Sequence, residues 1–494
     1  MDQPSRPADP GKLLILPVCL AMIGYAFLLA AWVMGNPSFE APDERSNYIR
    51  AIAVGAGELT GTRVPITIPQ SYDAKARAQT RWEGASTRTF SLDQRLISPV
   101  PSCNWTGSGP FRCTYRYVSG RRRVLSKVGT YPPLPYIVPG LTARLGSNSI
   151  QGLHYARAAS AFITALFLLA ALLAAADSLP AFAACNLAIT PTLVFSGSIV
   201  STSSIEIAGG LCFASTGFRL IRNRSTGIWW LPMGLSGAAL ALSRSASPLW
   251  LLLLAGLVLA VGPGLWRSSA ARKALGLALV GFLAEVAWGA TQEPHLRPVL
   301  SGFGVHLESS LRSLRYLLPE AVGNFGYVNV PLPGPEWAGW LLCLLVLVVA
   351  AAHAAGRRGR LALGAALACC FLVPVGFNTL LYAQTGFAPQ ARHFLPFWVA
   401  LPVLAGHLLT SSPSPGRVVR PLTLGVAVVV STVQFLAWYA NSRYWLVGSS
   451  GSLFFFHPSG WTPPLGVVPW LCLAIGGALS LSFAHISAAR REAA

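Results

Sequence analysis

The chain has 494 residues, of which 53% are hydrophobic and only 11% are charged. A soluble domain carries about 25% charged residues, so this composition excludes an ordinary soluble protein and indicates a chain solvated mainly by lipid. The formal net charge is +20, but the basic residues are dispersed between apolar segments. Membrane topology explains many of them, and nucleic acid is therefore not expected as a partner.

Apolar runs of membrane-spanning length recur along the whole chain. A spanning helix needs about 20 residues, and backbone groups have no partners in hydrocarbon, so these runs are predicted to be helices. The fold class we expect is an all-α polytopic membrane protein with about twelve spans. The predicted spans are 13–34, 153–174, 179–198, 205–221, 228–243, 248–266, 274–290, 337–355, 361–382, 394–411, 421–439 and 466–486.

The distribution of Arg and Lys predicts the orientation of these spans. If the N-terminus is cytoplasmic, five of the six short inside segments carry at least two Arg or Lys, as the positive-inside rule requires. Both termini are then cytoplasmic, and residues 1–34 form a short cytoplasmic N-terminus and a retained first helix. Residues 35–152 form a long outer segment, which should have compact structure of its own. The remainder, 153–494, is a bundle with outer loops 291–336, 383–393 and 440–465.

Cysteine placement agrees with this topology. Seven of the nine cysteines fall inside predicted spans, where they serve as small packing residues. Cys103 and Cys113 lie in the first outer segment around a turn rich in Gly and Pro. We predict a disulfide bond between them, which requires an oxidising compartment, because no His lies near them to favour a metal site.

Two adjacent carboxylates, Asp43 and Glu44, follow the first predicted span. Pro42 can begin a helix there, and both acids then lie near the positive end of the helix dipole. One interpretation is that they only favour the helix start. The other is that they do chemistry at the outer membrane surface, which depends on what faces them.

Arginines recur beside aromatic residues on the same predicted face. Arg392 stands at the mouth of the tenth predicted span, Arg443 beside the eleventh, and Arg244 in another outer turn. Arginine suits bidentate recognition of phosphate, so these three are the candidate phosphate-binding residues. The alternative is that they reach toward lipid headgroups. Glu206 and Glu285 lie in or near apolar segments, where charge is costly and faces the protein interior.

This set of residue types suits a lipid-phosphate sugar donor. Arginine would hold the phosphate, aromatic rings would stack on sugar, and one carboxylate would take the proton of an acceptor hydroxyl. Because phosphate is already a good leaving group, no second acid is needed, unlike in glycoside hydrolysis.

Several short motifs resemble the GT-C superfamily of polytopic glycosyltransferases, and in particular a bacterial branch of uncharacterised membrane proteins assigned to it. The opening Pro42-Asp43-Glu44 is similar to the first-loop acidic motif of that branch, where Asn47 stands in place of a His. Residues 131–136 are similar to its proline-rich approach to the second helix, and 323–333, 390–396 and 442–448 to its later segments. This chain departs from the pattern at Asn47, Tyr327, Ala391 and His393.

The resemblance implies a fold and a set of roles. It implies a GT-C-like bundle with Asp43 as general base and Glu44 as alternative base or metal ligand. Some relatives use a divalent cation, so that is the one cofactor left open, and no metal cluster is readable in the sequence. The substrate-binding residues that it implies are Asn47, Tyr48, Tyr327, Gln390, His393 and Tyr444.

The leading functional hypothesis is a membrane glycosyltransferase. It would move a sugar from a polyprenyl-phosphate donor to an envelope glycan, lipid or protein on the outer face of a bacterial plasma membrane. The bacterial source is indicated by richness in Ala, Gly, Leu and Arg with few Lys. A transporter or flippase of lipid-linked saccharides is the alternative, kept open by Glu206 and Glu285. A non-catalytic assembly partner is the third reading.

Overall fold

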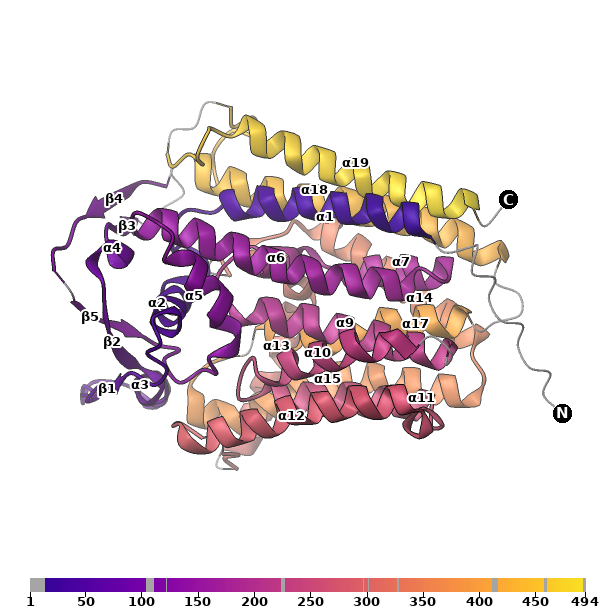
Figure 1. Cartoon of the computed structure of the whole chain (residues 1–494), viewed down its shortest axis with the longest axis horizontal. Helices are drawn as coiled ribbons and strands as arrows, with labels where there is room; N and C mark the ends of the chain where they lie inside the picture. Colours follow the sequence, from indigo (N-terminus) through magenta and orange to yellow (C-terminus); the bar gives the residue numbers. More distant parts are fainter. Residues whose placement is uncertain are drawn as a thin grey trace.

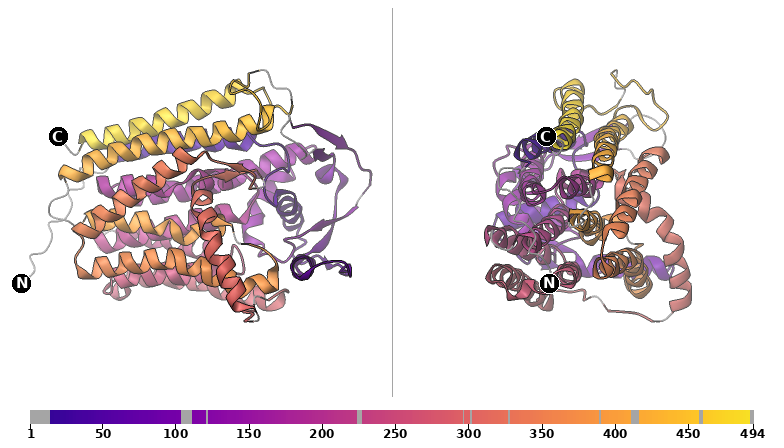
Figure 2. Two further views of the ribbon diagram at one scale, coloured as in Figure 1. Left: turned by 180° about the vertical axis from the view of Figure 1, so that it is seen from behind. Right: turned by 90° about the vertical axis from the view of Figure 1, so that its right-hand side faces the viewer.

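The chain folds into a helical bundle with a small mixed domain at one end (Figure 1). The structure is a computed structural model that describes residues 14–103, 111–120, 122–223, 227–295, 297–300, 302–326, 328–388, 390–410, 416–456 and 460–491. Figure 2 shows the bundle from behind and from one end, and in the second view many helices are seen nearly end-on.

The small domain, residues 35–148, is called the end domain below. It contains short helices and five strands, so the predicted outer segment has compact structure in the residues described. Its elements are α2 (Glu44–Gly55), β1 (Thr62–Arg63), α3 (Ala74–Ser86), β2 (Arg88–Leu92), α4 (Gln94–Ile97), β3 (Val100–Cys103), β4 (Cys113–Arg116), β5 (Arg122–Ser126), η2 (Leu134–Tyr136) and α5 (Ile137–Ala143).

The rest of the described chain is almost entirely helical, with one short β-hairpin near Gly326. Its elements are α1 (Ile15–Met34), α6 (Ser149–Ala175), α7 (Leu179–Ala188), α8 (Pro191–Gly197), α9 (Thr202–Arg222), η3 (Gly227–Trp229), α10 (Trp230–Ala241), α11 (Ser247–Val261), η4 (Leu265–Arg267), α12 (Ser269–Thr291), α13 (Phe303–Val322), β6 (Asn324–Phe325), β7 (Val330–Pro331), α14 (Gly334–Ala354), α15 (Arg357–Thr385), η5 (Ala391–His393), α16 (Leu395–Trp398), α17 (Ala400–Thr410), α18 (Gly416–Val447) and α19 (Val468–Arg491).

The structure supports a multi-pass membrane protein but not the full count of twelve spans. Among the described residues, seven helices are long and apolar enough to cross a membrane: α1, α6, α12, α14, α15, α18 and α19. The pair α7 and α8 makes an eighth if it is counted as one span. The four other predicted spans are helical too, as α9, α10, α11 and α16–α17, but they do not meet both criteria. The count of twelve therefore stays a prediction.

The predicted span 179–198 is not one continuous helix. It divides into α7 and α8, whose axes differ by 63°. Pro191 stands at the first turn of α8, and the Thr190 hydroxyl accepts the backbone N–H of Leu193 at 3.4 Å. Proline cannot donate the hydrogen bond that would continue α7, while it suits the first turn of a new helix. The predicted span 179–198 is therefore a broken helix, and it counts as one span only if α7 and α8 cross the membrane together.

The first and last long helices of the bundle pack closely against each other. A Cβ atom at Gly24 of α1 would lie 2.9 Å from the carbonyl oxygen of Gly477 of α19, and a Cβ at Gly477 would lie 2.9 Å from that of Gly24. Small residues of this kind allow helix backbones to approach closely in membranes. The start of α1 and the end of α19 lie at the end of the bundle opposite to the end domain (Figure 1).

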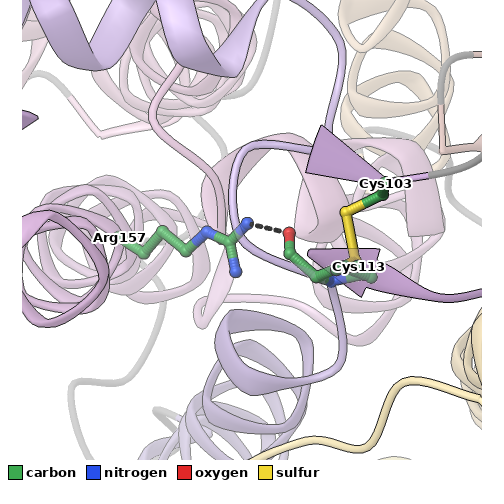
Figure 3. The surroundings of a disulfide bond; sticks show 4 residues. Cys103, Cys113 and Arg157 are labelled. Carbon is green, nitrogen blue, oxygen red and sulfur yellow. Dashed lines mark hydrogen bonds between the residues drawn. A yellow bond between two sulfur atoms is a disulfide. The ribbon is translucent and has the colours of Figure 1, made fainter. Parts of the chain in front are cut away.

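Two small antiparallel sheets shape the end domain. In the first sheet β2 lies between β1 and β5, with Phe90 opposite Val124. The second is the pair β3 and β4, in which Cys103 lies directly opposite Cys113. The predicted disulfide bond joins these two cysteines, as Figure 3 shows.

A buried arginine on α6 joins the end domain to the bundle. Arg157 is fully buried and uses all its N–H donors within the protein. Its Nε and Nη2 donate to the two carboxylate oxygens of Glu44 at 2.7 and 2.5 Å. Further bonds of 3.0, 2.8 and 2.9 Å go to the backbone carbonyls of Val33, Asn36 and Pro37. Figure 3 shows the guanidinium bonded to one nearby oxygen.

The carboxylate of Glu44 also accepts a hydrogen bond from the backbone. Its Oε1 accepts the backbone N–H of Val200 at 3.2 Å, in the turn between α8 and α9. One ion pair therefore connects the end of α1, the start of α2, α6 and the turn before α9. Such a pair specifies a geometry because breaking it leaves a charge without a partner in the interior.

We expect Arg157→Met to destabilise the protein by about 3–5 kcal/mol, because Glu44 would keep a buried charge without its partner. Thermal unfolding of the purified protein in detergent measures this. The double variant Glu44→Met/Arg157→Met should recover part of the loss, although the carbonyls of Val33, Asn36 and Pro37 stay without a donor.

The matched control is Arg312→Ala, which removes one partner of the exposed ion pair with Glu308 on α13. Exposed pairs contribute little, so this variant should melt close to the wild type. Equal melting temperatures for Arg157→Met and Arg312→Ala would contradict the structural role of the buried pair.

Candidate active site between the end domain and the bundle

Asp43 and Arg392 form an ion pair at the junction of the end domain and the bundle. The Nη2 of Arg392 donates to Oδ2 of Asp43 at 2.9 Å, across 349 residues of sequence. Asp43 precedes the first residue of α2, and its side chain makes no capping hydrogen bond to that helix. The carboxylate is instead directed at Arg392, so helix capping does not account for Asp43.

The backbone of Asp43 has a left-handed conformation, with φ of 58°. Aspartate is one of the few residues other than glycine that adopt this conformation readily. Asn47 holds it in place, because its backbone N–H and its side-chain Nδ2 both donate to the carbonyl oxygen of Asp43 at 2.9 Å. The Tyr136 hydroxyl then donates to Oδ1 of Asn47 at 2.6 Å.

These contacts change how Asn47 and Tyr48 are interpreted. Both were expected to bind substrate, but both are buried. The amide of Asn47 is engaged with Asp43 and Tyr136, and the hydroxyl of Tyr48 donates to the carbonyl of Leu96 at 3.1 Å. The structure therefore places both residues behind Asp43, where they support its position, while Tyr48 also lines a pocket within the end domain.

The two neighbouring carboxylates have different environments. The Asp43 side chain is 55% exposed, whereas the Glu44 side chain is 0% exposed and bonded to Arg157. Solvent, or a substrate in its place, can reach the first carboxylate and not the second. The sequence could not assign different roles to Asp43 and Glu44, whereas their different burial does so.

Arg392 lies in η5, between α15 and α16, and is mostly buried. Its side chain is 11% exposed, and Nε has no hydrogen-bond partner among the residues described. Burial lowers the pKa of the guanidinium, and contact with Asp43 opposes this. The carboxylate of Glu320, at the end of α13, accepts the backbone N–H of Ala391 at 3.2 Å and so helps to hold η5.

His393 stands next to Arg392 and is held neutral. Burial, together with Arg244 and Arg392, lowers its pKa well below the usual value. Its Nδ1 accepts the backbone N–H of Gln390 at 3.4 Å. Gln390 and Arg392 both line a small pocket of about 20 Å³, which also includes Pro42 and Glu320. A space of this size holds about one water molecule.

Arg244 joins the same cluster from the turn between α10 and α11. Its Nε donates to the Thr202 hydroxyl at 2.7 Å and its Nη2 to the Ser203 hydroxyl at 3.0 Å, both at the start of α9. Its guanidinium lies 5.7 Å from the ring centre of Tyr131 and 3.8 Å from the carboxylate of Glu206. The predicted cations Arg244 and Arg392 thus belong to one site.

Glu206 and Glu285 both lie toward the end domain. Glu206 accepts the Ser247 hydroxyl at 2.7 Å and is near Arg244. Glu285 is on α12, one turn before Trp288, whose indole N–H donates to the carbonyl of Thr130 at 2.9 Å. Neither acid lies midway along its helix, which is where a transport site would be expected.

Three other predicted residues have different placements. Arg443 donates to the backbone carbonyls of Ser449, Gly451 and Ser452, so it holds the loop after α18. The Tyr444 hydroxyl accepts the side-chain amide of Asn329 at 2.9 Å. Tyr327 lies outside the described residues.

Within the described part of the chain, no three His, Cys, Asp or Glu side chains gather in a way that could hold a metal ion. The accessible carboxylate of Asp43 is instead paired with Arg392. A role for Glu44 as a metal ligand does not fit its contacts, because both of its oxygens already accept hydrogen bonds.

Sequence reasoning missed Arg157 and Glu40. Arg157 carried a usable signal, since an arginine within a predicted span is costly and needs a partner. Glu40 lies in the turn before α2 and is 7% exposed. Its only signal was its place three residues before Asp43, and burial there could not be read from local sequence.

The fold and this junction define a polytopic helical membrane protein with a mixed domain inserted after its first helix. The chain belongs to the family described as predicted membrane protein DUF2142, which matches residues 26–401. The matched range includes Asp43, Glu206, Arg244 and Arg392, and it ends before Arg443.

Comparisons with individual proteins add one solved structure. No curated protein matches the chain. The crystal structure of ArnT from Cupriavidus metallidurans bound to undecaprenyl phosphate is similar at 13% sequence identity and a TM-score of 0.45. The match covers 96% of this chain and 76% of that one.

Glu40 predicts a pH dependence of stability. Burial, reinforced by Glu44, raises its pKa from 4.5 to about 7, while Arg45 and Arg157 lower it in part. Between these values the unfolded chain has lost a proton that the folded chain keeps, so stability falls as the pH rises from about 4.5 to about 7. Above that window the loss is complete and constant.

Melting curves of the wild type and Glu40→Gln across this range provide the measurement. The variant should gain stability relative to the wild type as the pH rises to about 7, and the difference should then level off. Glu308→Gln, which changes an exposed carboxylate on α13, should follow the wild type throughout. A difference between Glu40→Gln and wild type that is independent of pH would refute the assignment.

Proposed function

We propose that the protein is a membrane glycosyltransferase that moves a sugar from a polyprenyl-phosphate donor to an acceptor hydroxyl on the outer face of a bacterial plasma membrane. The observation that carries the proposal is the contact between Asp43 and Arg392, an accessible carboxylate beside a largely buried guanidinium. The similarity of residues 41–44 and 390–396 to the GT-C pattern supports the same assignment. Both termini are then cytoplasmic.

In this mechanism Asp43 is the general base. As the acceptor oxygen attacks the anomeric carbon, the carboxylate takes its proton and the new carbon–oxygen bond forms. The bond between that carbon and the donor phosphate breaks, and its electron pair leaves with the phosphate. The proton on Asp43 passes to water. Glu44 does not act as base, because it is buried and bonded to Arg157.

Arg392 and Arg244 would stabilise the departing phosphate. The Nε of Arg392 is buried and has no partner among the described residues, so a phosphate oxygen admitted to it would displace no existing hydrogen bond. Hydrogen bonds between charged groups in a partly desolvated site are worth more than in water. His393 is neutral beside them and adds no competing charge. Arg443 instead holds its own loop.

An apolar cavity next to this cluster suits the lipid chain of the donor. It has a volume of about 320 Å³ and lies among α7, α13, α14, α15 and the α16–α17 segment. Ala321 follows Glu320 directly, and Leu395 is three residues after Arg392, so the cavity begins where the polar cluster ends. Leu345 at its rim is exposed, which allows entry from the bilayer.

The variant Asp43→Asn should retain the fold and lose sugar transfer by about 10²–10⁴-fold in kcat, because the amide cannot accept the proton. Asparagine also tolerates the left-handed backbone at this position. The measurement is transfer of a radiolabelled sugar from a polyprenyl-phosphate donor by the purified protein.

Asp93→Asn is the matched control, since Asp93 caps α4 in the same domain and does not line the site. It should transfer at the wild-type rate. Unchanged turnover in both Asp43→Asn and Glu44→Gln would rule out this pair as the source of the base.

The variant Leu344→Trp should raise the KM for a long-chain donor, because the larger ring occupies the cavity meant for the lipid. Overpacking of this kind costs about 1–3 kcal/mol, equivalent to roughly 5- to 150-fold. A donor carrying only two isoprene units does not need the cavity, and its KM should stay unchanged.

The control is Leu279→Trp, which changes a residue on α12 that is exposed and does not line the cavity. Its KM should match the wild type for both donors. If Leu344→Trp raised the KM of the short donor as much as that of the long one, the cavity would not be the lipid site.

A further inference from the structure

A second pocket, separate from the Asp43 cluster, lies within the end domain. It has a volume of about 210 Å³ and is lined by α2, the end of α4, the β3–β4 pair, β5 and the first residue of α6. Four arginines contribute to its lining: Arg45, Arg116, Arg122 and Arg123. They come from three different elements, so the fold brings them together and they are not one basic stretch of sequence.

These arginines have little negative charge to balance them. None of the four forms an ion pair with an acid of the described chain, and Arg122 makes one hydrogen bond, to the Ser119 carbonyl at 3.2 Å. Glu40 interacts electrostatically with Arg45 but is itself buried. Like charges held together in one concave space favour binding of an anion from outside.

The remaining lining is apolar. Phe39, Tyr48, Ile49, Ile97 and Pro99 form part of it, and the rings of Phe39 and Tyr48 pack edge to face at 5.2 Å. An apolar wall with a basic edge suits a sugar that carries a phosphate or carboxylate, because rings pack on apolar surface while guanidinium groups bind the anion. An inorganic anion would contact the arginines and leave the apolar wall of the pocket unused.

The pocket lies close to the proposed base without overlapping it. Arg45 lies in the first turn of α2, two residues after Asp43, which precedes that helix. The base and the pocket therefore both lie at the start of α2. A molecule held in the pocket would reach Asp43 by extending around the start of α2.

We propose that this pocket binds the anionic part of the acceptor, a glycan bearing phosphate or carboxylate groups, and so presents one of its hydroxyls to Asp43. This assignment rests on the proposed function for the identity of the acceptor. The anion site itself rests only on the four arginines and the cavity. A phosphate on a water-borne glycan and one on a lipid headgroup share this chemistry, so the experiment includes both.

The test is a calorimetric titration, in which inorganic pyrophosphate is added to the full chain in phosphatidylcholine nanodiscs and the Kd is measured. Wild type should bind saturably, and Arg116→Ala/Arg123→Ala should raise the Kd by at least about tenfold, since two charge-assisted contacts are lost. Repeating the titration in nanodiscs that contain phosphatidylglycerol shows whether the bound anion comes from a lipid headgroup or from a soluble glycan. Competition by this lipid, seen in wild type and lost in the double variant, assigns the anion to a headgroup; no competition assigns it to a soluble acceptor.

The matched control is Lys75→Ala/Arg81→Ala, which removes two exposed cations of α3 in the same domain but outside the pocket. Its Kd should stay within about twofold of wild type. Should the alanine double variant fail to fold, Arg116→Lys/Arg123→Lys keeps the charge and loses the planar fork, and its Kd should rise at least about threefold.

Absence of saturable binding to wild type would overturn the proposal, as would equal weakening by the two alanine double variants. The result is separable from the glycosyltransferase assignment. The double variant Arg116→Ala/Arg123→Ala should weaken pyrophosphate binding in the Asp43→Asn background as much as in the wild type, because Asp43 does not line the pocket. If it did so while transfer by Asp43→Asn persisted, the base assignment would fail and the anion site would stand.

Discussion

The buried ion pair between Glu44 and Arg157 is the constraint on which the proposed site depends. It fixes the start of α2 against α1, α6 and the turn before α9. Because Glu44 is anchored there, its neighbour Asp43 is turned the other way, with its carboxylate on Arg392. The two adjacent acids therefore have different roles. The one that is buried supplies position, and the one that is exposed remains available for chemistry.

Charge is distributed around this junction in layers. Arg392 and Arg244 form the layer next to the bundle, with Glu206 and Glu320 behind them. An apolar cavity begins beside this layer, and the basic pocket of the end domain lies at the start of α2. A lipid carrier, its phosphate and an anionic acceptor would then meet at Asp43 from three directions. The apolar cavity would thus hold the lipid of the donor, and the two basic clusters would hold the anionic groups of donor and acceptor.

The sequence predicted a helical membrane protein with a structured segment after the first helix, and it predicted that Asp43, Arg244 and Arg392 share one face. It also predicted the disulfide bond. It could not predict that Asp43 touches Arg392, because 349 residues separate them and no local pattern encodes that contact. It could not divide Asp43 from Glu44, since their difference is burial. It could not predict that Asn47 and Tyr48 support Asp43, because their contacts with Tyr136 and Leu96 join residues that are distant in sequence.

The close packing of α1 against α19 has a consequence for biosynthesis. The first helix enters the membrane long before the last one is made, yet Gly24 meets its partner Gly477 only when synthesis is nearly complete. Until then α1 has a face without its final neighbour, and the loop that carries Asp43 is joined to an unfinished bundle. Arg392 too is translated late. Nascent chains would therefore lack a complete site, and the proposed sugar transfer would begin only after α19 has packed against α1.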